Sequence, residues 1–141
     1  MPADLSEIIK AGVRDIPDFP EPGVLFKDIT PLLSTPGSLQ AAVGAIAGHY
    51  GRGAIDSVAG LEARGFILAA PVALELGAGF VPIRKEGKLP ARTLRESYDL
   101  EYGTAAVEMH ADAITPGSRV LIVDDVLATG GTGRAAVELV R

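Results

Sequence analysis

Apolar positions in the first third of the chain recur at the spacing of helices. Near the start this set is Leu5, Ile8, Ile9 and Val13. It predicts a short amphipathic helix over the first dozen residues. A second stripe runs from Leu39 to Tyr50, for which Thr35 is the expected N-cap and Pro36 the first helical residue. Between the two helices, the proline-rich segment Pro17–Asp28 predicts a stiff, irregular stretch.

Farther along, short apolar runs alternate with helical segments. The runs that predict strands are Ala54–Gly60, Gly79–Ile83, Thr104–His110 and Arg119–Val123. Helices are expected from Gly65 to Leu76, ended by Gly77, and from Thr132 onward. The charged segment from Arg84 to Gly103 predicts a long polar loop, within a hairpin-like excursion. This order indicates an α/β fold with a mainly parallel sheet flanked by helices, in a single domain over residues 1–141.

Composition narrows the class of protein. The chain has 141 residues and a net charge of −5, which argues against a general nucleic-acid or acidic-membrane binder. It has no cysteine, so thiolate metal sites and disulfides are excluded. Its longest apolar run, residues 66–76, is too short to cross a bilayer. The first ten residues lack the pattern of a secretory signal, and we expect a cytoplasmic protein.

The stretch "VLIVDDVLATGGTG", residues 120–133, is the strongest candidate for chemistry. Ligands of open α/β sheets bind beyond the carboxyl ends of the strands, where Asp124 and Asp125 lie. The following loop leads into a helix N-terminus, which attracts anions. It offers glycines for close approach and hydroxyl donors: Gly130, Gly131, Thr129 and Thr132. A ribose 5-phosphate fits both parts, since it brings a phosphate to the loop and hydroxyls to the aspartates.

Other phosphate-binding motifs fit this stretch less well. A Walker motif needs a lysine that the loop lacks, and the spacing of a dinucleotide-binding loop is absent. The plain structural alternative is a strand, turn and helix with two solvated aspartates. Neither His49 nor His110 has a metal-ligand partner at a useful spacing, so both are interpreted as structural.

The same stretch resembles the phosphoribosyl pyrophosphate (PRPP) motif of the type I phosphoribosyltransferases. Three further stretches are similar to the branch of that family that acts on adenine: "FPEPGVLFKDITPLL", "AGLEARGFILAAPVALELG" and "IRKEGKLP…SYDLEYG". The resemblance extends from about Asp15 to Arg141. It implies a transfer of ribose 5-phosphate from PRPP to adenine, giving AMP and pyrophosphate. It also implies Mg²⁺ bound with PRPP, a homodimer, and a small N-terminal hood over residues 1–34.

The resemblance assigns roles to individual residues. Asp124 and Asp125 would face the ribose hydroxyls. The 5-phosphate loop would be Ala128, Thr129, Gly130, Gly131 and Thr132. Pyrophosphate contacts would come from Arg64, Arg84, Lys85 and Lys88. The adenine contacts would be Leu25, Phe26 and Lys27. Glu101 would manage a proton on the purine, with Arg64 as the second catalytic group, and Tyr102 would cover the site. No metal is assigned to a side chain.

Several of these assignments have a structural alternative. Arg64 and the basic cluster would otherwise be solvated surface charges, Glu101 a surface charge, and Phe26 a core residue. Two other functions also remain open: a transferase for xanthine or for hypoxanthine and guanine, and a PRPP sensor without catalysis. The family's chains generally continue for some tens of residues after the last helix. We therefore expect this sequence to lack that segment, and an inactive fragment is a further alternative.

Overall fold

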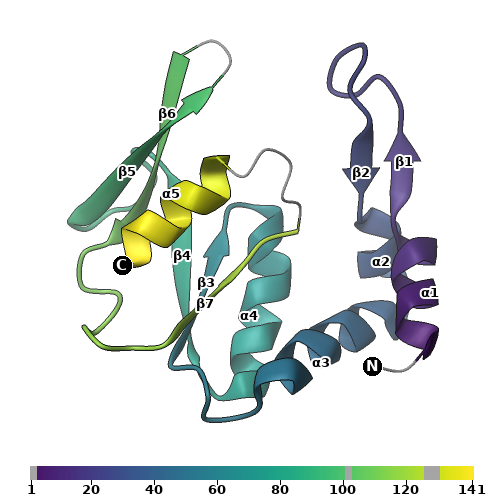
Figure 1. Ribbon diagram of the computed structural model, residues 1–141, viewed down its shortest axis with the longest axis horizontal. Helices are drawn as coiled ribbons and strands as arrows, with labels where there is room; N and C mark the ends of the chain where they lie inside the picture. Colours follow the sequence, from purple (N-terminus) through teal and green to yellow (C-terminus); the bar gives the residue numbers. More distant parts are fainter. Residues whose placement is uncertain (1–2, 101–102, 126–130) are drawn as a thin grey trace. The chain divides into compact units, whose positions relative to one another are not determined.

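The computed structural model describes residues 3–100, 103–125 and 131–141. The chain forms two compact units, Met1–His49 and Tyr50–Arg141, each with its own secondary structure (Figure 1). Among the residues described, no helix combines the length and the apolar character needed to span a bilayer.

The first unit holds three helices and a two-stranded antiparallel sheet. Its elements are α1 (Ala3–Gly12), β1 (Arg14–Ile16), β2 (Phe26–Asp28), α2 (Thr30–Ser34) and α3 (Ser38–Tyr50). Part of the segment expected to be irregular is thus a strand, because β2 pairs with β1 in the register Arg14↔Asp28 and Ile16↔Phe26. Buried apolar side chains from the helices and their flanks form the core of this unit: Leu5, Ile29, Leu32, Ala42, Val43 and Ala47.

The prediction that Thr35 caps the second helix is wrong. Thr35 instead ends α2, where its backbone N–H donates to the carbonyl oxygen of Pro31 at 3.1 Å. The long helix α3 begins three residues later, at Ser38. Thr35 is extended at this point, with its hydroxyl 2.6 Å from the same Pro31 oxygen, so its side chain serves the preceding helix.

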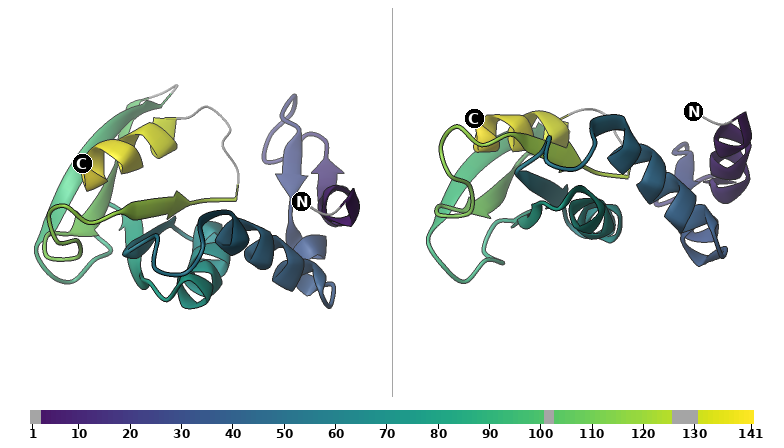
Figure 2. Two further views of the ribbon diagram at one scale, coloured as in Figure 1. Left: turned by 60° about the horizontal axis from the view of Figure 1, so that its bottom comes forward. Right: turned by 90° about the horizontal axis from the view of Figure 1, so that it is seen from below.

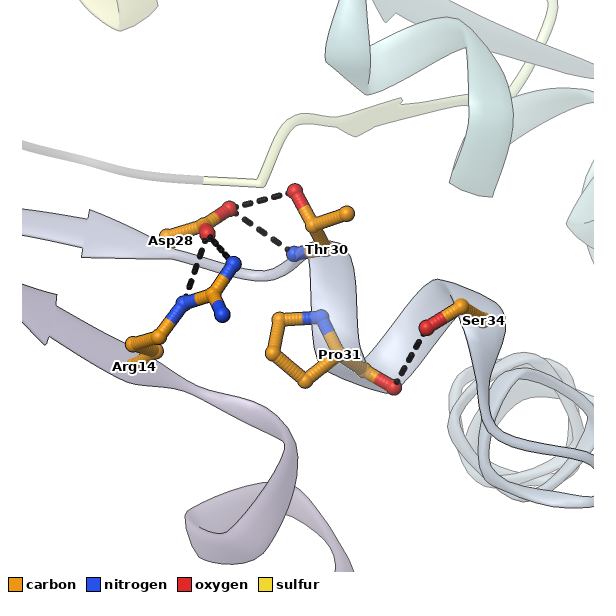
Figure 3. A network of polar contacts seen from close by, with 5 residues as sticks. All are labelled: Arg14, Asp28, Thr30, Pro31 and Ser34. Carbon is orange, nitrogen blue, oxygen red and sulfur yellow. Dashed lines mark hydrogen bonds and ion pairs between the residues drawn. The ribbon is translucent and has the colours of Figure 1, made fainter.

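Asp28 joins the end of β2 to α2 through a network of polar contacts (Figure 3). The guanidinium of Arg14 donates to its Oδ2 from Nε at 3.1 Å and from Nη2 at 2.7 Å. Its Oδ1 accepts the backbone N–H of Thr30 at 2.9 Å and the hydroxyl of the same residue. The Thr30 hydroxyl first, and then Arg14, lower the pKa of Asp28 to about 2. The carboxylate therefore stays ionised at neutral pH.

The second unit is a five-stranded sheet in the order β5-β6-β4-β3-β7. Its strands are β3 (Ser57–Leu61), β4 (Gly79–Lys85), β5 (Thr93–Leu100), β6 (Gly103–His110) and β7 (Val120–Val123). The strand β3 pairs in parallel with both β4 and β7, whereas β6 pairs antiparallel with β4 and β5. The sheet is therefore mixed, with its parallel part formed by the three strands that precede the candidate ligand loops.

Two helices cover opposite faces of this sheet, α4 (Arg64–Leu76) and α5 (Gly131–Val140) (Figure 2). Alternate residues of a strand point to opposite faces. Ala59 and Leu61 of β3 belong to the core cluster that includes Ala135 and Leu139 of α5. The helix α4 ends as predicted at Gly77, which has the left-handed backbone conformation with φ 69°.

Gly60, on the other face of β3, allows α4 to lie against the sheet. A Cβ atom at this position would be 2.6 Å from Cβ of Ala69 and 3.1 Å from Cε1 of Phe80. Ala69 is a fully buried residue of α4, so its methyl group has no room to retreat. The helix and the strand are therefore packed at a distance that only glycine permits.

The segment predicted as one long polar loop, Arg84 to Gly103, is mostly strand and turn. Residues 84–85 end β4, and residues 93–100 form β5, which pairs with β6 from Thr93↔His110 to Leu100↔Gly103. Sequence patterning missed β5 because most of its side chains are exposed and several are charged. A strand at the edge of a sheet needs fewer apolar residues than a central one.

Candidate functional site

Three of the predicted ligand residues of the second unit lie at the carboxyl ends of its parallel strands. Because β3 and β7 are parallel, with Gly60 opposite Val123, their carboxyl ends meet. Arg64 follows β3 at the start of α4, and Asp124 and Asp125 follow β7. The structure thus brings these three predicted residues together.

Asp125 makes an ion pair with Arg64. Its Oδ2 atom lies 2.9 Å from Nε of Arg64, and its side chain is only 3% exposed, against 46% for the arginine. No hydrogen bond from the described residues reaches this buried oxygen. A charge in this position depends on its partner, since removing the partner would leave a buried carboxylate uncompensated. The pair therefore links the loop after β3 to the loop after β7.

Asp124 has a different environment. Its Oδ1 accepts the backbone N–H of Asp125 at 2.8 Å. Although the residue is largely exposed, partial burial of its carboxyl and the neighbouring Asp125 carboxyl raise the pKa of Asp124 to about 6. The positive charge of Arg64 opposes this rise only in part. The carboxyl of Asp124 therefore loses its proton at a higher pH than an ordinary aspartate does.

Gly65 permits the close approach of the two strand ends, and the sequence analysis did not single it out. A Cβ atom there would lie 3.0 Å from Oδ1 of Asp124 and 3.1 Å from the carbonyl oxygen of Val123. The residue is buried in the first turn of α4. Its position directly after Arg64 was the available signal, because backbone that approaches a ligand loop often requires glycine.

A second cluster surrounds Glu62, the residue between β3 and the arginine loop. Its Oε1 accepts the backbone N–H of Lys85 at 2.6 Å and lies 3.3 Å from Nε of Arg84. Its Oε2 accepts from Nζ of Lys88 at 2.9 Å. Partial burial opposes the charge of Glu62, but the hydrogen bonds from Lys88 and Lys85 outweigh it and lower the pKa of this carboxyl. Two of the predicted cations, Arg84 and Lys88, therefore pair with one carboxylate, which also accepts the backbone N–H of Lys85, and no role was predicted for this carboxylate.

The turn that carries these cations is well defined. The N–H of Lys88 donates to the carbonyl of Lys85 at 3.3 Å, and Gly87 has φ 86°, as the third position of a type II turn requires. Oε1 of Glu108 accepts the N–H of Gly87 at 2.8 Å, and its Oε2 accepts from the hydroxyl of Thr93 at 3.0 Å. Side chains of the neighbouring strands thus fix the turn.

The predicted adenine contacts belong to the first unit. Phe26 is in β2, and its ring meets that of Phe19 edge to face, with centroids 5.2 Å apart. Nζ of Lys27 lies 2.6 Å from Oδ1 of Asp15 on the paired strand. Leu25 is 54% exposed. The exposed side chain of Leu25 and the ring of Phe26 thus provide apolar contact at the start of β2.

Several predicted residues lie outside the described part of the chain: Glu101, Tyr102, Ala128, Thr129 and Gly130. Gly131 and Thr132 are described, and they begin α5. The motif is therefore followed by the N-terminus of α5 at Gly131, as predicted. In the described ranges, no group of three or more histidine, aspartate or glutamate residues is arranged to hold a metal ion.

The sequence is similar to proteins of a single family. The family model for the phosphoribosyl transferase domain matches residues 28–141. An adenine phosphoribosyltransferase of Thermobifida fusca is 72% identical over 141 residues, which are all of this chain and 80% of that protein.

Solved structures are also similar. The adenine phosphoribosyltransferase of Rhodothermus marinus has 55% identity and a TM-score of 0.91, over 99% of this chain and 79% of that one. The enzyme of Saccharomyces cerevisiae, in complex with an iminoaltritol bisphosphate and adenine, has 42% identity and a TM-score of 0.93. That match covers 99% of this chain and 81% of the yeast chain.

Proposed function

The chain belongs to the phosphoribosyltransferase family and, within it, to the adenine phosphoribosyltransferases, and we propose that the carboxyl ends of β3, β4 and β7 form its PRPP site. The enzyme transfers ribose 5-phosphate from PRPP to adenine and so forms AMP in purine salvage. The observation that supports the location is the ion pair of Arg64 with the buried Asp125, beside the cations gathered around Glu62.

Asp124 and Asp125 are proposed to accept hydrogen bonds from the two ribose hydroxyls. Transfer from PRPP passes through a state with positive charge developing at C1 of the ribose. Carboxylates fixed near the ring favour that charge without having to reorganise during the reaction. The Asp125 side chain is held by Arg64 and by burial, so its position is set before the substrate arrives.

Pyrophosphate is the leaving group, and it carries several negative charges. We assign its contacts to Arg64 at the start of α4, to Arg84 and Lys85 at the end of β4, and to Lys88 in the turn that follows. Arginine suits this task because its planar group binds two phosphate oxygens at once. These cations would stabilise the charge that collects on the leaving oxygens.

The remaining roles are assigned by family membership. The loop from Ala128 to Thr132 would hold the 5-phosphate at the N-terminus of α5. Adenine would meet the backbone around Leu25 and Lys27 and the ring of Phe26. Glu101 would exchange a proton with the purine, while Tyr102 would help to exclude water.

Magnesium fits the donor set of this site. The residues at the strand end are carboxylates, and hard oxygen ligands with retained water suit Mg²⁺. We propose that it arrives with PRPP, held largely by pyrophosphate and ribose oxygens, and that it neutralises part of the leaving group's charge. A homodimer and a cytoplasmic location stay predictions.

The base that the enzyme accepts can be tested directly. Purified protein with PRPP and Mg²⁺ is expected to form AMP from adenine, and no nucleotide from hypoxanthine, guanine or xanthine. A 6-oxo purine presents the opposite donor and acceptor pattern, which leaves buried groups unpaired. Turnover of a 6-oxo purine would instead support the rival transferases. PRPP binding without any product would support a sensor, and absence of both would overturn the proposed site.

The raised pKa of Asp124 predicts a pH dependence of PRPP binding. With the pKa of Asp124 near 6, the carboxyl is mostly protonated at pH 5 and mostly ionised at pH 7. A protonated carboxyl is a poorer acceptor for ribose hydroxyls. The KM for PRPP is therefore expected to fall about tenfold between pH 5 and pH 7, in line with one ionising group.

PRPP itself titrates in this range, and the variant Asp124→Asn provides the control. It lacks the ionising carboxyl, so only the ligand's own titration remains in its profile. A variant whose KM changes with pH as steeply as that of the wild type would contradict the role given to Asp124.

A further inference from the structure

We propose that Glu62 is a positioning residue for the pyrophosphate end of PRPP. Its carboxylate pairs with Arg84 and Lys88 and fixes their side chains, so that their remaining donors can bind the leaving group. This inference rests on the proposed function, since it concerns the same carboxyl ends of β3, β4 and β7.

The carboxylate of Glu62 is itself fixed. Its side chain is 10% exposed, and its Oε1 accepts the backbone N–H of Lys85 at 2.6 Å. Its own N–H donates to the carbonyl of Ile83 at 3.0 Å, continuing the parallel pairing of β3 with β4. A carboxylate tied to the backbone of the neighbouring strand cannot move without moving the strand end.

The contacts use only part of each cation. Arg84 approaches Glu62 through Nε at 3.3 Å, which leaves the two terminal nitrogens of its guanidinium for a bidentate partner. Lys88 donates one of its three ammonium hydrogens, and its side chain remains 48% exposed. One nitrogen of each cation thus lies against Glu62, as a hydrogen bond for Lys88 and as an ion pair without a hydrogen bond for Arg84, and we propose that the other donors bind phosphate oxygens.

The charge balance supports the same role. Glu62 pairs with the side chains of two cations, Arg84 and Lys88, which leaves an excess of one positive charge, and Lys85 contributes its backbone N–H. The lowered pKa of Glu62 keeps it ionised near neutral pH. The cluster therefore still attracts a multiply charged anion, while the carboxylate limits the repulsion between cations that must lie close together.

The test compares Glu62→Gln and Glu62→Ala with the wild type. The glutamine keeps an oxygen that can accept from the N–H of Lys85, but it removes the charge that holds Lys88. We expect Glu62→Gln to raise the KM for PRPP and the dissociation constant of pyrophosphate about tenfold, with the KM for adenine unchanged. Glu62→Ala should have a larger effect, and hydrogen exchange of the Lys85 amide should be faster in this variant only.

Glu86→Gln is the matched control. Glu86 lies on the same turn and pairs with Arg95, with both side chains more than half exposed. This change removes one acidic charge at nearly the same place, so it should leave both constants unchanged. An equal effect of Glu86→Gln would mean that general charge, rather than the contacts of Glu62, sets the affinity.

The variant Lys88→Met tests whether Glu62 acts through Lys88. If it does, the effects of Glu62→Gln and Lys88→Met on pyrophosphate binding should be less than additive when combined. Lys88 is exposed enough that its replacement should not prevent folding. Full additivity would overturn the inference.

Two failures can be told apart. Wild-type protein that binds neither PRPP nor pyrophosphate in calorimetry would overturn the proposed function, and this inference with it. If the wild type binds both, and Glu62→Gln binds pyrophosphate as tightly or more tightly, only the role of Glu62 is overturned. Tighter binding would mean that the carboxylate competes with the ligand for the cations.

Discussion

Replacing Asp125 with asparagine is expected to lower kcat/KM for PRPP by about 100-fold or more, the size typical of losing a fixed electrostatic contact to a transition state. The change removes the buried carboxylate that Arg64 holds at 2.9 Å. It also removes the neighbouring carboxyl that helps to raise the pKa of Asp124. Both the proposed ribose contact and the orientation of the arginine would be affected, and steady-state kinetics with adenine in excess would measure the loss.

The fold should survive this substitution. An asparagine side chain has nearly the same volume as that of aspartate, and Arg64 is exposed enough for water to solvate it once its partner is neutral. We expect the free energy of unfolding to change by no more than about 1 kcal/mol, because a buried charge and its repulsion with Asp124 disappear together with the pair.

Asp56→Asn is a suitable control for this prediction. Asp56 also pairs with an arginine, Arg119, at 3.4 Å, but it lies before β3 and β7 rather than after them. It should therefore leave kcat/KM nearly unchanged. Full activity of Asp125→Asn would reject the ribose-contact role, and an equal loss in Asp56→Asn would show that the effect is not specific to the strand ends.

Replacing Gly60 with alanine is expected to destabilise the second unit by about 1–3 kcal/mol, as overpacking of a filled core does. The new methyl group would lie 2.6 Å from Cβ of Ala69 and 3.3 Å from the carbonyl oxygen of Gly65. To relieve the first contact, α4 must move away from β3. Urea unfolding followed by circular dichroism would measure the change.

Gly79→Ala provides the comparison. Gly79 is also in a strand, β4, but no atom of the described residues lies within 4 Å of the position that its Cβ would take. This variant should be as stable as the wild type or slightly more so, because alanine restricts the unfolded chain. Equal losses in the two variants would mean that strand glycines matter for their backbone freedom and not for the packing of α4.

The central elements could be predicted from sequence because a strong local pattern marks each of them. The apolar run of β7 precedes an acidic pair and a glycine loop, and α4 ends at a glycine with positive φ. These signals are local, so the edge of the sheet and its candidate ligand residues followed from them.

The contacts of Glu62 could not be predicted in this way. They depend on the register of β3 against β4, which places Leu61 opposite Ile83 and so brings Glu62 to Arg84 and Lys85. Register between strands that are separated by a whole helix is a property of the packed fold. The short motif around Arg64 therefore does not predict which cations pair with Glu62. The prediction that Thr35 is an N-cap failed for a different reason. The short helix α2, which ends at this residue, was not predicted from the sequence.

The polar strand β5 also bears on how the enzyme behaves at high concentration. It lies at an edge of the sheet, where unpaired backbone groups invite a strand from another molecule. Its exposed charges, Arg95 and Asp99, make such an added strand unfavourable. The composition that made this segment resemble a loop is therefore a protection against aggregation.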